Sequence, residues 1–266
     1  MDVKDIERSI IKTFKSKIYA KFLRAIKEYS LVEDGDSICV CISGGKDSFV
    51  MAKCFQELKR HSKFQFDVKF VVMDPGYRKE HLDKIKNNLK HLNIEAEIFE
   101  SNIFEDIKSY DSICYFCARK RRGFLYAKAK KLGCNKIALG HHFDDVIETI
   151  LLNILYAGEY KTMMPKLKST NFEGMELIRP MYFIKEKDII AWKNHCNLTF
   201  LNCACTVVKE KMGKRREVKE LIESFRKIDK NIDIHIFKSS ENINIDAVLG
   251  YKDSTGFHSF LDEYND

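Results

Sequence analysis

The chain has 266 residues, 45% of them hydrophobic, and a formal net charge of +7 at pH 7. This apolar content supports a sizeable core and excludes an intrinsically disordered chain. No run of 18 apolar residues occurs, so no membrane span is expected. The charged start Met1–Asp5 predicts no secretory signal. We therefore expect a cytoplasmic protein with one large domain and small additions.

The charge is unevenly distributed along the sequence. After Ser240 the chain has six acidic residues and one lysine, so the preceding part is more basic than the total. A basic body favours an acidic partner, with nucleic acid as the first candidate. A lysine-rich composition with solvated faces would produce the same balance, so charge alone leaves both interpretations open.

The first two thirds of the chain alternate between strand and helix patterns. Helical apolar spacing over residues 1–30 is followed by a turn at 31–36. Strands are expected at 38–42, 67–73, 94–99 and 136–139, and helices at 46–58, 78–92, 117–132 and 144–156. This alternation predicts an α/β fold with a Rossmann-like, doubly wound parallel sheet. Ligands of such sheets bind at the carboxyl ends of the strands.

The remaining third has shorter signals. A strand-like segment at 176–179 precedes expected helices at 185–196 and near 209–228, and residues 232–237 are again strand-like. We expect an N-terminal helical segment at 1–35, a main domain at 36–230 and a C-terminal tail at 231–266. The sheet would thus carry N-terminal helices and a C-terminal helical extension.

Residues 43–48 read Ser-Gly-Gly-Lys-Asp-Ser and connect the first expected strand to the first helix of the sheet. Two glycines allow close approach of the backbone to an anion, and a helix N-terminus favours negative charge. The spacing is neither that of a Walker A loop nor G-x-G-x-x-G. An ordinary glycine turn would not need this set of polar and basic residues. The predicted nucleotide contacts are Ser43, Gly44, Gly45, Lys46, Asp47 and Ser48.

A second polar loop, residues 140–145, follows the strand at 136–139. Asp144 is placed to cap the next helix, whereas Asp145 and Asp47 are candidates for holding Mg²⁺ or positioning phosphates. Gly140 and His141 are candidates for nucleotide contact, and a purely structural histidine is the alternative. Met73 ends the second strand, where it would border the nucleotide.

Nine cysteines in an expected cytoplasmic chain do not indicate a disulfide framework. Five are expected to act as small buried hydrophobes: Cys39, Cys41, Cys54, Cys134 and Cys196. The other four form a C-x-x-C and a C-x-C pattern: Cys114, Cys117, Cys203 and Cys205. The C-x-x-C alone is compatible with a redox pair, zinc or iron–sulfur ligation. Four thiolates would complete a zinc site, whereas three would leave one iron of a cluster open.

Two basic segments accompany the cysteine patterns. Seven of the thirteen residues from Arg119 to Lys131 are Lys or Arg, and a second basic cluster follows Cys205. We predict that these segments contact RNA phosphates, with solvated helix faces as the alternative. The predicted RNA contacts are Arg119, Arg121, Arg122, Lys214, Arg215 and Arg216.

Taken together, these motifs resemble the tRNA 2-thiocytidine biosynthesis (TtcA) family of PP-loop pyrophosphatases. The matching segments occur in family order: SGGKDS at 43–48, CYFCARKRRG at 114–123, KIALGHHFDDVIETILLN at 136–153, MMPKL at 163–167 and LIRPM at 177–181. The resemblance implies a PP-loop ATPase fold and a tRNA sulfurtransferase that forms AMP and pyrophosphate. It also implies the cofactors ATP, Mg²⁺ and a [4Fe–4S] cluster held by three cysteines.

By position, the resemblance implies Cys114 and Cys117 as cluster ligands, with Cys205 favoured over Cys203 as the third. Lys46, Asp47 and Asp145 would be the catalytic residues. The implied partners are tRNA and a sulfur donor, either sulfide or a cysteine desulfurase, with a homodimer left open and no membrane. The alternatives are a PP-loop enzyme that thiolates uridine or uses a nitrogen nucleophile, and a zinc-stabilised RNA-binding module without catalysis.

Overall fold

The computed structural model describes residues 1–101, 113–201, 213–262 and 264, and only the backbone of residues 113–118. The chain forms two compact units. The first comprises Met1–Val146 and Met163–Gly213, and the second comprises Ile147–Thr162 and Lys214–Asp266. The division into 1–35, 36–230 and 231–266 stays a prediction.

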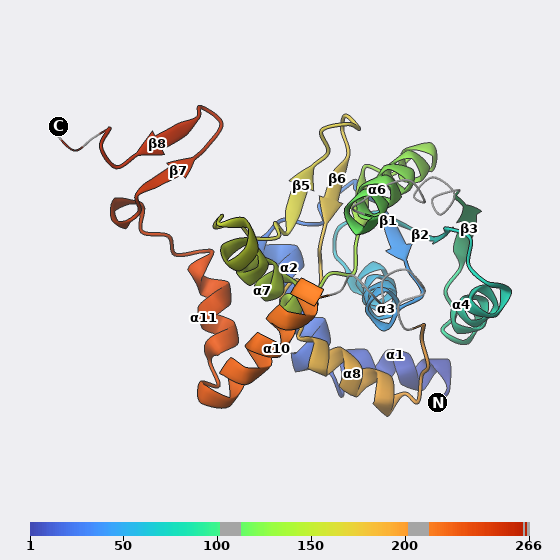
Figure 1. Ribbon diagram of the computed structural model, residues 1–266. Helices are drawn as coiled ribbons and strands as arrows, with labels where there is room; N and C mark the ends of the chain where they lie inside the picture. Colours follow the sequence, from blue (N-terminus) through green and yellow to red (C-terminus); the bar gives the residue numbers. More distant parts are fainter. Residues whose placement is uncertain (102–112, 202–212, 263, 265–266) are drawn as a thin grey trace. The chain divides into compact units, whose positions relative to one another are not determined.

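A six-stranded sheet in the order β3-β2-β1-β4-β6-β5 forms the centre of the first unit (Figure 1). All neighbouring strands are parallel except β5 and β6. The strands are β1 Ser37–Ile42, β2 Asp67–Asp74, β3 Ala96–Glu100, β4 Lys136–Ala138, β5 Lys166–Lys168 and β6 Glu176–Ile178. The predicted α/β fold with a parallel sheet is confirmed, and β5 is an additional antiparallel edge strand.

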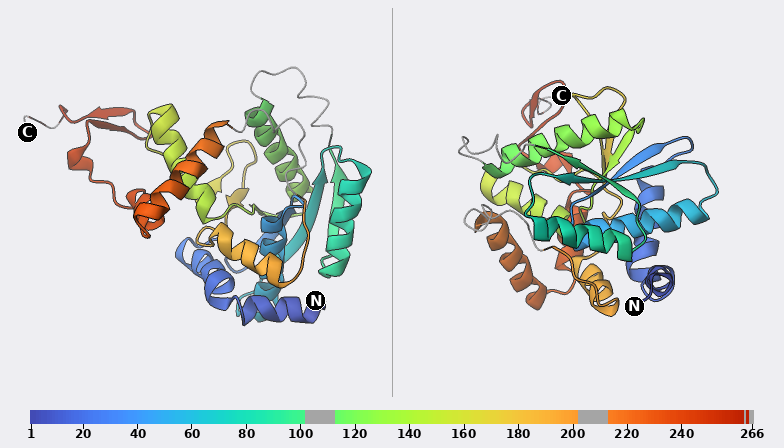
Figure 2. Two further views of the ribbon diagram at one scale, coloured as in Figure 1. Left: turned by 60° about the horizontal axis from the view of Figure 1, so that its bottom comes forward. Right: turned by 90° about the vertical axis from the view of Figure 1, so that its right-hand side faces the viewer.

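The helices of the first unit agree closely with the expected ranges. They are α1 Val3–Ile11, the π-helical turn η1 Lys15–Tyr19, α2 Ala20–Glu28, α3 Lys46–His61, α4 Lys79–His91, α6 Ile113–Lys131 and α8 Glu186–His195. Helix α7 Phe143–Leu152 begins in this unit and ends in the second. Helix α6 covers one face of the sheet, and α3 and α4 cover the other (Figure 2).

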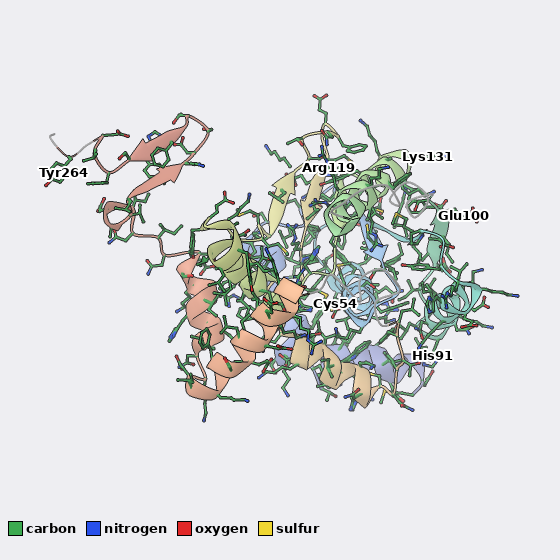
Figure 3. All side chains as sticks on the ribbon, in the orientation of Figure 1. Cys54, His91, Glu100, Arg119, Lys131 and Tyr264 are labelled. Carbon is green, nitrogen blue, oxygen red and sulfur yellow. The ribbon has the colours of Figure 1, made fainter. Side chains whose placement is uncertain are left out.

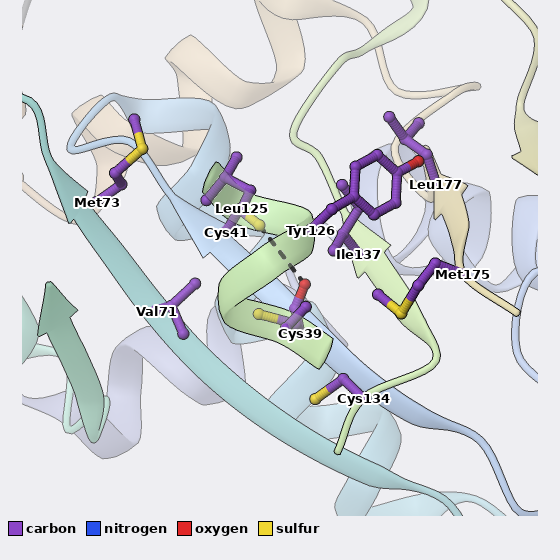
Figure 4. Close-up of a cluster of buried hydrophobic side chains, with 11 residues drawn as sticks. Cys39, Cys41, Val71, Met73, Leu125, Tyr126, Cys134, Ile137, Met175 and Leu177 are labelled. Atoms are coloured by element: carbon purple, nitrogen blue, oxygen red, sulfur yellow. Dashed lines mark hydrogen bonds between the residues drawn. The ribbon is translucent and has the colours of Figure 1, made fainter. Parts of the chain in front are cut away.

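The core beneath α6 explains this layering (Figure 4). Successive strand side chains alternate between faces, so Cys39 and Cys41 of β1 point toward α6, where they meet Leu125 and Ala129. The intervening Val40 is fully buried on the opposite face. The five cysteines predicted as hydrophobes are confirmed as free and buried: Cys39, Cys41, Cys54, Cys134 and Cys196.

The second unit is helical with a small hairpin. After α7 come η2 Asn153–Ala157, α10 Gly213–Ile228, α11 Ile232–Ser239, the 3₁₀ turn η3 Ile245–Ala247 and the strands β7 Gly250–Lys252 and β8 Phe257–Ser259. The strand expected at 232–237 is wrong, because this segment belongs to α11. Asp233 and Phe237, four residues apart, are both buried, and Asp233 accepts a 2.7 Å hydrogen bond from Arg226 Nε.

None of the described helices is both long enough and apolar enough to cross a membrane. The tail residues expected to carry weak signals instead form the two-stranded antiparallel pair β7 and β8. These strands have three residues each, which explains why no periodicity indicated them.

Candidate active site

The two polar loops singled out in the sequence meet at the carboxyl edge of the sheet. The phosphate loop, residues 43–48, follows β1, and residues 140–145 follow β4, the neighbour of β1. Strand β1 pairs with β2 on its other side, so this is the point where strand order reverses. Open α/β sheets bind their ligands at such a point.

The phosphate loop is closed by its own backbone and hydroxyl groups. Gly44 adopts φ +86°, a conformation that strongly favours glycine. The buried Ser48 hydroxyl accepts a hydrogen bond from Ser43 N at 3.1 Å and donates one to Gly45 O at 2.8 Å. Helix α3 then starts at Lys46, with its N-terminal amides at the loop. The arrangement forms an anion cradle of backbone donors.

Gly140 lets the second loop approach this cradle. A Cβ atom at Gly140 would lie 3.2 Å from Ser48 N and 3.3 Å from the carbonyl carbon of Asp47. Both neighbours are backbone atoms at the start of α3, so neither can move without displacing the helix. The glycine predicted to contact nucleotide therefore also sets the spacing between the two loops.

Lys46 is held by two carboxylates. Its Nζ lies 2.9 Å from Glu186 Oε1 and 3.2 Å from Asp47 Oδ1. Burial opposes the charge of Lys46, but Asp47 and Glu186 outweigh it and raise the pKa of this lysine. Lys46 is therefore cationic at neutral pH and is aimed into the site. No sequence signal pointed to Glu186, because it lies 140 residues further along the chain.

Asp47, Asp145 and His142 form a compact polar cluster. His142 is buried, with Nε2 3.8 Å from Asp47 Oδ1 and Nδ1 3.4 Å from Asp145 Oδ2. Burial raises the pKa of Asp47, and Asp145 adds to this rise, while His142 and Lys46 oppose it. The histidine in the cluster is thus His142. His141, the predicted nucleotide contact, is the half-buried residue before it.

Asp144 links the second loop to helix α8. Its Oδ2 accepts a 2.7 Å hydrogen bond from the backbone N–H of Glu186, the first residue of α8. That N–H has no partner within its own helix, so Asp144 serves as the cap. The cap also places Glu186 opposite Lys46. Asp144 was expected to cap its own helix, α7, and instead caps a different one.

Met73 and its neighbour Asp74 end β2. The Met73 side chain is buried in the core beneath α6. Asp74 Oδ1 accepts hydrogen bonds from Gly76 N and Tyr77 N, which fixes the turn after β2. The nucleotide contact expected at Met73 stays a prediction.

The predicted RNA contacts lie in α6 and α10. Arg119 is exposed, and Arg121 and Arg122 are half-buried. In the second unit, Arg215 Nε pairs with the buried Glu148 at 2.8 Å and Arg216 Nε pairs with Glu220 at 2.8 Å. Lys214 Nζ lies 4.8 Å from the centre of the Tyr156 ring. Contact of these residues with RNA stays a prediction.

The cysteine patterns are only partly within the described residues. Cys114 and Cys117 occupy positions i and i+3 in the first turns of α6, and their side chains lie outside the description. Cys203 and Cys205 also lie outside the described residues. Within the part that is described, no group of three or more metal-binding side chains forms a metal site. Metal ligation by the four cysteines therefore stays a prediction.

Comparison with known families shows which family has this sequence. The model of the PP-loop domain matches residues 14–205, which include both polar loops and all six strands of the main sheet. The chain belongs to the PP-loop family. The similarity inferred from the motifs is thus confirmed, together with the fold it implies.

Curated relatives of this PP-loop protein share most of its length. It is 34% identical over 225 residues to the tRNA-cytidine(32) 2-sulfurtransferase of Geotalea uraniireducens, covering 83% of this chain and 88% of that one. It is 39% identical over 210 residues to the enzyme of the same name from Aliivibrio fischeri, covering 76% and 67%. This agrees with the resemblance to the TtcA family seen in the sequence.

A solved structure shares the fold. The U34-tRNA thiolase NcsA from Methanococcus maripaludis, determined with its [4Fe–4S] cluster, superimposes with a TM-score of 0.68 at 22% identity. The match covers 86% of this PP-loop chain and 78% of the thiolase. At this identity the similarity concerns the fold.

Proposed function

We propose that this PP-loop protein is an ATP-dependent tRNA thiolase that replaces the 2-oxygen of a cytidine with sulfur. The observation that carries the proposal is the joint presence of an anion cradle with a paired lysine and an Asp–His–Asp cluster at one sheet edge. It is supported by 32–39% identity to tRNA-cytidine(32) 2-sulfurtransferases. A cytoplasmic location follows from the tRNA substrate.

The reaction has two stages. The base carbonyl oxygen attacks the α-phosphorus of ATP, the bond from that phosphorus to the pyrophosphate breaks, and the oxygen becomes an adenylate ester. A sulfur nucleophile then adds at the base carbon, and AMP leaves with the original oxygen. Lys46 and the amides at the start of α3 stabilise the negative charge on the departing pyrophosphate. The sulfur comes from sulfide or from a cysteine desulfurase.

The carboxylates of the site fit a divalent cation. Asp47 Oδ1 is buried and accepts no hydrogen bond from any described residue, and Asp145 lies across His142 from it. Hard oxygen ligands beside a phosphate site are what Mg²⁺ takes. Asp47 and Asp145 would hold the ion, which would neutralise phosphate charge. His142 keeps the two carboxylates apart and donates its backbone N–H to Asp145 Oδ2 at 2.9 Å.

The cysteine set fits an iron–sulfur cluster. Cys114, Cys117 and one of Cys203 and Cys205 would be the ligands, and a three-cysteine [4Fe–4S] cluster supplies one open iron at which sulfur can bind. Leu201 N donates a 3.1 Å hydrogen bond to Gly44 O, so the segment that leads to Cys203 in the sequence is attached to the phosphate loop. A zinc-stabilised RNA-binding module would leave this phosphate loop without a role.

The decisive experiment measures thiolated nucleosides by mass spectrometry in tRNA from a strain lacking the gene. The proposal expects 2-thiocytidine to disappear and to return with the wild-type gene but not with the Lys46→Ala variant. Loss of a thiouridine instead would favour the uridine branch. If every thiolated nucleoside persists, the thiolase proposal is wrong.

A further inference from the structure

A buried arginine outside the phosphate loop faces the same carboxyl edge. Arg179 directly follows β6, the strand beside β4, and is 5% exposed. One of its terminal nitrogens donates to Met164 O, and its backbone N donates to Pro165 O at 2.9 Å. Its Nε is buried and has no hydrogen-bond partner among the described residues.

A second arginine, Arg122 of α6, is near enough for its positive charge to act on Arg179. Burial lowers the pKa of Arg179 to about 10, and the next largest cause is the positive charge of Arg122 of α6. Burial raises the pKa of Tyr126, which lies one turn after Arg122, and the charges of Arg122 and Arg179 both oppose this rise. Two positive charges, those of Arg122 and Arg179, thus act on each other in a partly buried region. The neutral side chains of Tyr126 and Tyr182 are their neighbours.

Among the described residues, no carboxylate pairs directly with either of these two charges. Within the described chain, neither Arg122 nor Arg179 forms an ion pair with an acidic residue. Among the described residues that most affect the pKa of Arg179, Asp145 is the carboxylate, and its effect is the smallest of them. A buried cation without a counter-charge is strongly unfavourable, so such groups mark places where an anion binds.

We propose that Arg179 and Arg122 form a binding site for a phosphoryl oxygen, separate from the phosphate loop. This inference rests on the proposed function, which brings phosphates of both ATP and tRNA to this edge. The planar guanidinium matches a phosphate through paired N–H donors, and the unpartnered Nε of Arg179 is one such donor. Asp145, whose charge also acts on Arg179, belongs to the loop at 140–145, so the site lies at the same carboxyl edge.

The Met164 contact gives the competing explanation, in which Arg179 only anchors the MMPKL segment. Tyr182 shares that task, since its hydroxyl donates to Met163 O at 2.7 Å. Anchoring does not require Arg122, which contacts neither carbonyl. Arg122 therefore separates the two explanations, because its removal leaves the anchor intact and removes half of the anion site.

The test measures binding without turnover, using the full chain. The probes are an unmodified tRNA transcript and an ATP analogue with a methylene group between the α- and β-phosphates. The variants are Arg122→Gln and Arg179→Lys, and the control is Lys90→Gln. Lys90 is exposed on α4, beside His91 and outside both basic segments; His91 and Arg119 of α6 are labelled in Figure 3.

We expect both arginine variants to weaken the same probe by roughly 10- to 100-fold, as loss of a charge-assisted hydrogen bond implies. Lys90→Gln should change either affinity less than about two-fold, because an isolated exposed charge contributes little. Weaker tRNA binding with a shallower salt dependence assigns the site to an RNA phosphodiester. Weaker analogue binding assigns it to the nucleotide.

Unchanged affinity of Arg122→Gln for both probes would overturn the proposal and leave Arg179 as an anchor. If Arg179→Lys does not fold, Arg122→Gln decides alone, since Arg122 is only half-buried. The proposed function is tested separately, by whether the wild-type protein forms the thiolated product. A wild type that forms no thiolated base, but loses affinity on Arg122→Gln, would refute the thiolase and retain the anion site.

Discussion

Lys46 has an acidic partner on each side before any substrate is bound. Asp47 and Glu186 hold its ammonium group and raise its pKa, although burial opposes the charge. The side chain is therefore preorganised, which is the property that electrostatic stabilisation of a transition state requires. The surrounding residues make Lys46 the most informative position for testing the reaction.

We predict that Lys46→Ala lowers the thiolation rate on the order of 10²-fold or more, because one charged contact to the departing phosphates is lost. Folding and iron content should be unchanged, since the substituted residue lies on the phosphate loop. The measurement is single-turnover formation of thiolated tRNA. Lys187→Ala, exposed on α8, is the control and should keep wild-type activity. Wild-type turnover by the Lys46 variant would contradict the phosphate-loop assignment.

The raised pKa of Asp47 should make the stability of the protein depend on pH. Burial, with a contribution from Asp145, raises its folded pKa above the ordinary value of 3.8. The folded state therefore holds this proton more tightly than the unfolded state, so the residue costs stability as pH rises above that value. Asp47→Asn removes the cost, and its Tm at pH 7 should exceed that of the wild type.

The difference in Tm should shrink toward about pH 4, where the carboxyl is increasingly protonated in both states. Thermal unfolding of the nucleotide-free protein across this range measures it. Thiolation should be lost in the same variant, which is the trade-off expected where a strained charge serves function. A wild type that is more stable than Asp47→Asn at pH 7 would show that Asp47 is a structural ion-pair partner.

At the scale of elements, the start of α8 connects the two sides of the site. Asp144 caps this helix from the loop after β4, and the capped residue is Glu186. Asp144→Ala should lower the free energy of unfolding by about 0.5–2 kcal/mol, the usual cost of a lost cap. It should also weaken ATP binding, because Glu186 loses its fixed position opposite Lys46.

Urea denaturation measures the first effect and nucleotide titration the second. Asp144→Asn keeps an oxygen acceptor and should recover most of the stability. If the alanine variant is as stable as the wild type, the 2.7 Å contact contributes nothing to α8.

The alternating strands and helices could be predicted because their patterns are local. The apolar run before Ser43 and the polar loop after β4 were both found in this way. The prediction of a strand at 232–237 was wrong because isoleucines at every second position imitate the pattern of a strand. In the structure Asp233 and Phe237, four residues apart, are buried together, as on one face of a helix. Strand β5 is Lys-Leu-Lys at a sheet edge, where charged residues are expected and no apolar pattern forms.

The candidate site was predictable at its loops but not where distant segments meet. Glu186 reaches Lys46 across 140 positions, and no local spacing encodes that contact. His141 was selected from the sequence and His142 was missed. The side chains of adjacent loop residues point in different directions, and tertiary packing decides which of them enters the site. The bridge between His142 and Met181 belongs to the same class of long-range contact.

At the scale of the whole molecule, the prediction concerns metal identity. Anaerobically reconstituted protein should bind about four irons per chain, and Cys114→Ala and Cys117→Ala should each abolish this. Only one of Cys203→Ala and Cys205→Ala should do so, because three ligands must leave one iron open. Cys54→Ala, a buried free thiol, is the control. One tightly bound zinc that needs all four cysteines would refute sulfur delivery by a cluster.

The hydrogen bond from Leu201 N to Gly44 O joins two segments through main-chain atoms alone. The side chain at position 201 can therefore change without breaking this hydrogen bond, whereas proline there would remove the donor. Position 44 requires glycine because of its positive φ. The attachment of Leu201 to the phosphate loop then depends on the backbone and not on the side chain at position 201. Substitutions of the side chains around this hydrogen bond would then change what the site contacts and leave the bond itself in place.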